Sequence, residues 1–197
     1  DFCKSENVVV ISKVNEGACQ YLELPFYCNL VSYGNNVVAS VDVDIADFVK
    51  EYVDSYPSEH CFETPHMQVL NAELKKRGMG ICFMAEYFLP DRDLLSEEPS
   101  DYRIQALTQA ELVELYLPQW SNALCEERKH LDKLAVAAYN GDEMIGLAGC
   151  SADCASMWQI GVDVLHKYRK KGVASALTSR LALETIERGK VPFYCCA

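Results

Sequence analysis

A strand that runs directly into a basic loop and a helix is the feature that most constrains the fold of this chain. Residues 158–164 carry apolar side chains at alternate positions, as a strand does, and residues 173–188 have helical spacing. The segment between them ends in three consecutive cations and a glycine, Arg169, Lys170, Lys171 and Gly172. The sequence therefore predicts a strand, a tight turn and a helix N-terminus, with positive charge at the junction.

This junction has the physical properties of a phosphate-binding site. The first turn of a helix has backbone N–H groups without an intrahelical partner, and the peptide dipoles place about half a positive charge there. Gly172 lets a ligand approach the backbone, and the small side chains of Ala174, Ser175 and Ala176 leave it accessible. Loops of this kind also occur without any ligand, so the spacing alone leaves both interpretations open.

The stretch Val162–Ala174 resembles the acyl-CoA-binding signature of the Gcn5-related N-acetyltransferases (GNAT). The family pattern is an apolar-x-Val strand end followed by Arg/Gln-x-x-Gly-x-Gly/Ala. Here His166 stands where proline is common, and Ala174 replaces the more usual second glycine. The resemblance covers roughly residues 103–197 and implies a mixed α/β fold, with a mostly antiparallel, twisted sheet flanked by helices.

The resemblance also implies that acetyl-CoA is the cosubstrate. In the family, the signature strand splays from its neighbour and pairs through its backbone with the pantetheine arm, and the loop amides hold the pyrophosphate. The cofactor-binding residues implied for this chain are Val162, Asp163, Val164, Arg169, Lys170, Lys171, Gly172, Val173, Ala174 and Ser175.

The implied reaction is acetyl transfer to a primary amine of a small molecule or peptide by direct attack. A base or a water chain must deprotonate the amine, and a backbone N–H can polarise the thioester carbonyl. Many family members have a glutamate early in the signature strand, where residues 157–159 offer no carboxylate. Asp153 and Asp163 are the nearest candidate bases, and water-mediated deprotonation is the alternative. A non-catalytic CoA-binding or protein-interaction module is the alternative function.

Residues 89–101, rich in Pro, Ser and acidic side chains, predict a domain boundary near Asp101. Residues 1–101 would be a smaller N-terminal α/β domain, and residues 102–197 the GNAT domain. The first domain is expected to be a degenerate second GNAT copy, to shape the acceptor pocket, or to stabilise a homodimer. In the family, the last strand predicted here is followed by a helix and a closing hairpin, and the helix commonly carries a tyrosine that acts as the general acid. We therefore expect the fold to be completed by residues beyond 197 or by another chain.

Hydrophobic periodicity predicts the elements of both halves. In the first half we expect strands at 8–11, 19–33, 37–43 and 81–88, a hairpin turn at Asn35–Asn36, and helices at 44–54 and 65–77. In the second half we expect a helix opened by a Thr108–Glu111 capping box, a type I′ turn at Asn140–Gly141, and a last strand at 191–197.

Composition limits the remaining functions. A net charge of -11 argues against nucleic acid and anionic membrane as partners, and no apolar run is long enough to span a bilayer. The ten cysteines include no Cys-x-x-Cys, and the start of the chain does not resemble a secretion signal, so we expect a reduced, cytoplasmic protein. Cys150 with Cys154, and His60 with Glu63 and His66, fit no common ligand spacing, so we expect no metal.

Overall fold

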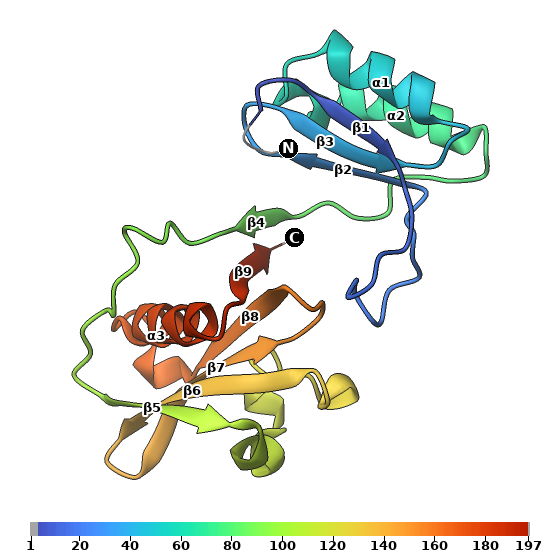
Figure 1. Cartoon of the computed structure of the whole chain (residues 1–197). Helices are drawn as coiled ribbons and strands as arrows, with labels where there is room; N and C mark the ends of the chain where they lie inside the picture. The colour runs from blue at the N-terminus through green and yellow to red at the C-terminus, as the bar shows by residue number, and fades with distance from the viewer. Residues whose placement is uncertain (1–3, 197) are drawn as a thin grey trace. The chain divides into compact units, whose positions relative to one another are not determined.

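The computed structural model describes residues 4–196, which divide into two compact units (Figure 1). One unit comprises the chain up to Glu16 together with Leu22–Met84, and the other comprises Gly17–Tyr21 and the chain from Ala85 onward. The predicted domains of residues 1–101 and 102–197 stay predictions. Cys3 and the last residue of the predicted final strand, Ala197, lie outside the described residues.

The first unit is a three-stranded sheet with two helices. Its central strand is β3 (Val37–Val41), which β1 (Val8–Ile11) joins in parallel and β2 (Cys28–Ser32) joins antiparallel. The helices are α1 (Ala46–Ser55) and α2 (His66–Lys75). A short 3₁₀ helix, η1 (His60–Phe62), stands between them. The core of this unit contains Val37, Ala39, Val41, Ile45, Val49, Tyr52, Val53, Cys61, Leu70 and Leu74.

Three predicted strands of the first half are shorter than expected, and one of them is β3, which ends at Val41 instead of residue 43. The hairpin turn at Asn35–Asn36 is confirmed, because Tyr33 N–H donates to Asn36 O and β2 pairs with β3. Residues 19–27 are not a strand, and Pro25, which has no N–H to donate, lies among them. Of the predicted strand 81–88, only β4 (Glu86–Phe88) forms, and it pairs with a strand of the second unit.

The second unit is a six-stranded sheet in the order β4-β9-β8-β7-β6-β5. The strands after β4 are β5 (Arg103–Thr108), β6 (Asp132–Asn140), β7 (Glu143–Ser151), β8 (Met157–Val164) and β9 (Val191–Cys196). Only β8 and β9 pair in parallel, and every other neighbouring pair in this sheet is antiparallel. The predicted fold class, a mixed and mostly antiparallel sheet flanked by helices, is confirmed.

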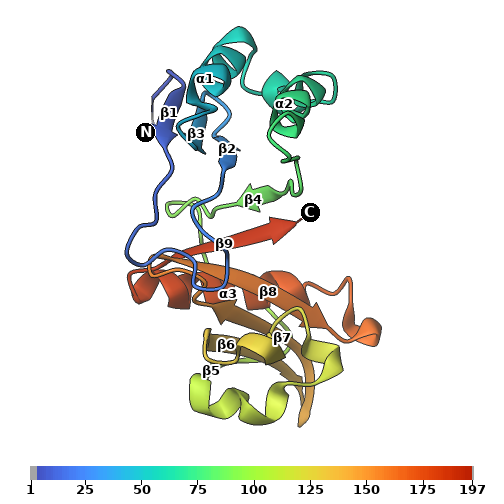
Figure 2. The ribbon, with the colours of Figure 1, turned by 90° about the vertical axis from the view of Figure 1, so that its right-hand side faces the viewer.

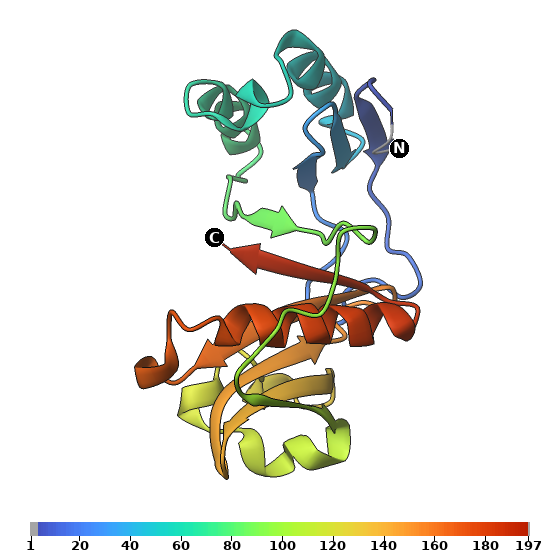
Figure 3. The same cartoon turned by 90° about the vertical axis from the view of Figure 1, so that its left-hand side faces the viewer.

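Different helices pack on the two faces of this sheet. α3 (Val173–Glu187) lies along one face (Figure 3), and the 3₁₀ helices η2 (Gln109–Leu115), η3 (Pro118–Trp120) and η4 (Glu126–Arg128) belong to the other. Alternation along β6 explains the division, because successive side chains of a strand point to opposite faces. Leu134, Val136 and Ala138 join the α3 cluster, and Ala135 and Ala137 join the cluster of Leu112 and Trp120.

Two local predictions in this unit need correction. β6 and β7 pair through Asn140 and Glu143, so the turn residues are Gly141 and Asp142. Of these, only Gly141 has a positive φ, 61°, which fits a type II′ turn because type I′ needs two positive φ values. The capping box of Thr108 and Glu111 forms as predicted, but it opens the 3₁₀ helix η2 instead of an α-helix.

Candidate functional site

The site begins where the parallel strands β8 and β9 separate. Their pairing runs from Met157 opposite Val191 to Ile160 opposite Tyr194 and stops there. Beyond Ile160, β8 pairs only with β7, whereas β9 continues alongside β4 (Figure 2). The backbone of β8 from Gly161 onward therefore has no strand partner on its β9 side within the described residues.

Unused backbone groups of β8 point into this opening. Leu165 N–H donates to Ile145 O of β7 at 2.9 Å. Because N–H and C=O groups alternate in direction along a strand, those of Val164 and Val162 point away from β7. Arg169 agrees with this geometry, since its Nε donates to Val164 O at 3.0 Å. Val162 thus offers one donor and one acceptor at the open edge.

The loop after β8 ends in an uncapped helix N-terminus. Lys170 and Gly172 have φ values of 62° and 77°, and Gly172 is the N-cap of α3 with no side-chain hydrogen bond. The first amide of α3 with a backbone acceptor is that of Ala176, which donates to Gly172 O at 3.0 Å. In the described part of the chain, the amides of residues 173–175 have no protein acceptor, so they can bind an anion.

Hydrogen bonds and an ion pair hold this loop against the β6–β7 hairpin. Tyr168 is buried; its hydroxyl donates to Glu143 Oε2 at 2.8 Å and accepts from Asn140 Nδ2 at 3.0 Å. Lys167 Nζ lies 2.8 Å from Glu143 Oε1, and these contacts lower the pKa of the Glu143 carboxyl. The charge of Lys167 is thus paired with that of Glu143, whereas Arg169, Lys170 and Lys171 make no ion pair among residues 4–196.

Some of the predicted cofactor residues present their backbone to the opening between β8 and β9, and others present their side chains. The side chain of Val173 is buried in the core, so only its backbone can reach a ligand, whereas Ala174 and Ser175 are exposed. The side chains of Val162 and Val164 pack against the α3 cluster. The structure brings residues 169–175 together at one end of β8, with Val162 and Val164 along the open edge.

Asp163 points to the opposite face of β8. Its carboxylate accepts hydrogen bonds from Asn122 N–H at 2.8 Å, Asn122 Nδ2 at 2.7 Å and Ala123 N–H at 3.0 Å. The Asn122 segment lies so close to the sheet that a Cβ on Gly161 would overlap the carbonyl oxygen of Asn122. Three donors therefore occupy the Asp163 carboxylate in this structure.

Asp153 lies in a different polar cluster. It is 6% exposed and accepts hydrogen bonds from Tyr21 OH at 3.0 Å and Ser151 Oγ at 2.8 Å. Burial, with the Asp153 charge as the next cause, raises the pKa of Tyr21. Nearby Asp132 is also buried, and burial raises the pKa of its carboxyl. The two predicted bases are thus held by separate sets of donors.

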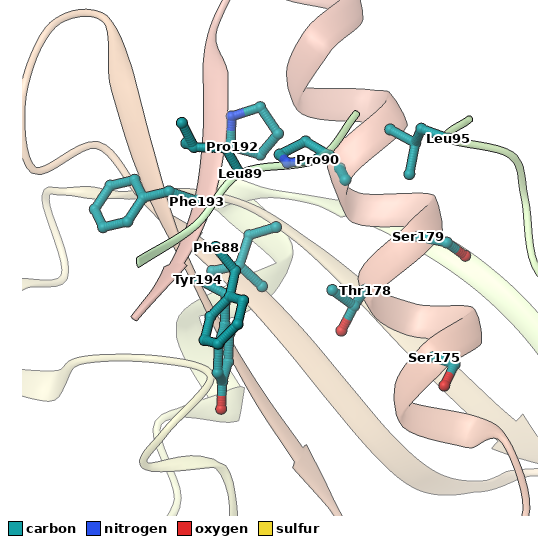
Figure 4. A pocket seen from close by; sticks show the side chains of 12 residues that line it. Phe88, Leu89, Pro90, Leu95, Ser175, Thr178, Ser179, Pro192, Phe193 and Tyr194 are labelled. Carbon is teal, nitrogen blue, oxygen red and sulfur yellow. The ribbon is translucent and has the colours of Figure 1, made fainter. Parts of the chain in front are cut away.

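A cavity of about 320 Å³ lies between α3 and β9 (Figure 4). Neither Asp153 nor Asp163 lines it. Its walls are Phe88, Leu89, Pro90, Leu95, Ile160, Ser175, Thr178, Ser179, Ala182, Pro192, Phe193 and Tyr194.

Sequence reasoning misses most of these residues. The prolines and acids of residues 89–101 predict a linker there, although Leu89, Pro90 and Leu95 line the cavity. The signal that could have found them is the apolar run Phe88-Leu89-Pro90 at the start of that linker, since exposed linkers rarely need consecutive large apolar side chains. Among residues 4–196, no cluster of three His, Cys, Asp or Glu side chains could hold a metal ion. No helix in this range is long and apolar enough to cross a membrane.

The chain was compared with known proteins. A family model described as GNAT acetyltransferase matches residues 59–197. A comparison with curated proteins gave no significant match.

Solved structures similar to this chain include three proteins. The GCN5-related N-acetyltransferase from Kribbella flavida is 18% identical over 57% of this chain and 47% of its own, with a TM-score of 0.44. A GNAT-family acetyltransferase from Novosphingobium aromaticivorans is 17% identical over 57% and 51%, with a TM-score of 0.42. A GCN5-related N-acetyltransferase-like protein from Streptococcus suis is 15% identical over 68% and 58%, with a TM-score of 0.40. The chain spans about half the length of these structures, and similarity at this level says nothing about a substrate.

Proposed function

The chain belongs to the GNAT acetyltransferase family, and from this premise we propose that it is an N-acyltransferase that moves an acetyl group from acetyl-CoA to a primary amine. The observation that carries the proposal is the opening between β8 and β9, at one end of which stands the uncapped, basic N-terminus of α3. A net charge of -11 favours a cationic amine of a small molecule or peptide as the acceptor.

The residues present fit a CoA thioester. We assign the pyrophosphate to the amides of residues 173–175, with Arg169, Lys170 and Lys171 supplying opposite charge. Gly172 carries no side chain above the loop, and a Cβ there would meet open space, so the approach to these amides is clear. The free N–H and C=O of Val162 suit the amides of the pantetheine arm, which need one acceptor and one donor each.

In the proposed reaction the neutral amine attacks the thioester carbonyl carbon, and the C–S bond breaks as CoA leaves as a thiolate. A backbone N–H at the open edge of β8 stabilises the oxyanion. Asp163 already accepts three hydrogen bonds and Asp153 is buried against Tyr21, so we assign removal of the amine proton to water. The thiolate then takes a proton from solvent.

Three further assignments belong to this proposal. Residues 1–101 form an N-terminal domain of their own, the protein acts in the cytoplasm, and a homodimer is its working form. The first rests on the predicted boundary near Asp101, and the other two rest on composition and family resemblance.

Thiol release tests the proposed activity. The chain is incubated with acetyl-CoA and a panel of polyamines, aminoglycosides and lysine peptides, and free CoA is measured against a no-amine control. Amine-dependent release of CoA supports the transferase. Binding of CoA with no release across the whole panel would instead support the non-catalytic CoA-binding module.

A further inference from the structure

The cavity between α3 and β9 changes in character along its length. Near the N-terminus of α3 it is lined by the hydroxyl-bearing side chains of Ser175 and Thr178. At the other end, where residues 89–90 cross between β9 and α3, the side chains that line it are apolar (Figure 4). That end is formed by Leu89, Pro90, Leu95, Ala182 and Pro192.

The one hydroxyl close to the apolar end is already used. Ser179 Oγ donates to Ala176 O at 3.2 Å and accepts from Glu98 N–H at 3.0 Å. The amides of a pantetheine arm would find no partner at this end, and a buried unpaired amide is costly. The apolar end therefore suits a hydrocarbon group.

Residues 88–98, which include one wall of the cavity, make contacts with both β9 and α3. Phe88 of β4 pairs with Tyr194 of β9. On the α3 side, Glu97 forms an ion pair with Arg180 at 3.2 Å, and the Glu98 amide bonds Ser179. The cavity is thus a built feature of this unit, and its volume of about 320 Å³ is within the size range of small-ligand pockets.

Ile160 connects this cavity to the proposed cofactor site. It is the last residue of β8 paired with β9, and it also lines the cavity. From Val164 to Ile160 the strand rises about 13 Å. From Ser175 to Ala182 the helix rises about 10 Å. The acyl group of a CoA thioester held along the open edge of β8 would therefore lie beside the apolar end of the cavity.

Resting on the proposed function, we infer that this cavity accepts the acyl chain of a CoA thioester longer than acetyl. A methyl group would leave most of the space empty, whereas each further methylene buried there adds about fourfold in affinity. The donor preferred by this site is a straight-chain acyl-CoA, with the polar arm on the edge of β8 and the hydrocarbon between α3 and residues 89–95.

Calorimetry on the intact chain with CoA, acetyl-CoA and hexanoyl-CoA, without an acceptor, tests this inference. We expect hexanoyl-CoA to bind at least tenfold more tightly than acetyl-CoA. Leu89→Trp, at a half-exposed position whose side chain lines the cavity, should remove that advantage and change acetyl-CoA affinity less than twofold. Leu94→Trp is the matched control, because Leu94 is 80% exposed and does not line the cavity.

Each other outcome overturns a different claim. Equal or weaker binding of hexanoyl-CoA, with acetyl-CoA still bound, would overturn the acyl-chain inference and leave the proposed function standing. A hexanoyl advantage that survives Leu89→Trp would overturn the assignment to this cavity. Failure of all three CoA species to bind would overturn the proposed function and this inference with it.

Discussion

The carboxylate of Asp163 accepts hydrogen bonds from both the backbone N–H and the side-chain amide of Asn122, at 2.8 Å and 2.7 Å. With the bond from Ala123 N–H, these contacts fix residues 122–123 across the face of β8 opposite α3. Asp163 therefore acts in this structure as a positioning residue, since its oxygens are occupied by the protein's own donors.

Asp163→Asn should affect stability more than chemistry. Hydrogen bonds to a charged group contribute about 1.5–3 kcal/mol each, and these are partly exposed, so we expect a loss of roughly 1–2 kcal/mol in unfolding free energy. With water as the proton acceptor, kcat should fall less than tenfold with an unchanged pH profile. Urea unfolding and the thiol-release assay measure the two effects, with exposed Asp142→Asn as control. A hundredfold loss of kcat at full stability would identify Asp163 as the base.

Gly161→Ala should destabilise the second unit by more than about 2 kcal/mol, because the new Cβ would overlap the backbone carbonyl of Asn122, which cannot move without breaking the Asp163 contacts. Gly80→Ala is the matched control: its Cβ would lie at an ordinary 3.5 Å from Asn71 Oδ1. Chemical denaturation compares the two. Equal stability of both variants would show that the Asn122 segment does not lie against β8 as described.

Tyr168→Phe should weaken CoA binding about three- to tenfold. The change removes the hydroxyl that joins the basic loop to Glu143 and Asn140, so the loop loses part of its preorganisation. Tyr102→Phe is a suitable comparison, because Tyr102 packs edge-on against Tyr168 at 5.8 Å and its hydroxyl has no partner in the described chain. Calorimetry with CoA reports the difference. Identical affinities for the two variants would contradict a positioning role for Tyr168.

Glu184→Gln tests the acid sensitivity of α3. Hydrogen bonds from Arg188 and then Arg180 lower the pKa of Glu184, so its folded-state pKa lies below its unfolded value. The stabilisation is therefore present above an unfolded pKa of about 4.3 and is lost as pH falls through the folded pKa. At pH 7 we expect a loss of about 0.5–1 kcal/mol relative to wild type, and this loss should shrink as the pH falls through the folded-state pKa of Glu184. Urea titrations at pH 7 and at a series of lower pH values check this, with exposed Glu187→Gln as control. A stability difference between wild type and Glu184→Gln that stays constant with pH would contradict the lowered pKa of Glu184.

The sequence is most informative where structure depends on neighbouring residues. The strand, basic loop and helix from Trp158 to Arg188 form as predicted because alternation, Gly172 and helical spacing are all local signals. The predicted turn at Gly141 is wrong in type, since the Asn140–Glu143 pairing that frames it depends on the register of two whole strands. The helix after Thr108 is a 3₁₀ helix, and Pro118 lies close behind it.

Long-range contacts explain what sequence reasoning could not find. The donors to Asp163 lie about forty residues earlier in the chain, and no local pattern links Asn122 to that carboxylate. Likewise, β4 pairs with β9 more than a hundred residues later, which turns an apparent linker into a wall of the cavity. The sequence indicates the anion-binding end of the site but not the apolar end.

Calorimetric titration of CoA into the wild-type chain and into Gly172→Glu tests whether the N-terminus of α3 binds the pyrophosphate of CoA. Glutamate would place bulk and negative charge over the amides of residues 173–175. Gly189→Glu is the matched control at the other end of α3, because Gly172 and Gly189 both have a positive φ and open space where a Cβ would lie. We predict that wild type and Gly189→Glu bind CoA alike and that Gly172→Glu binds at least a hundredfold more weakly. CoA binding by Gly172→Glu with wild-type affinity would contradict it.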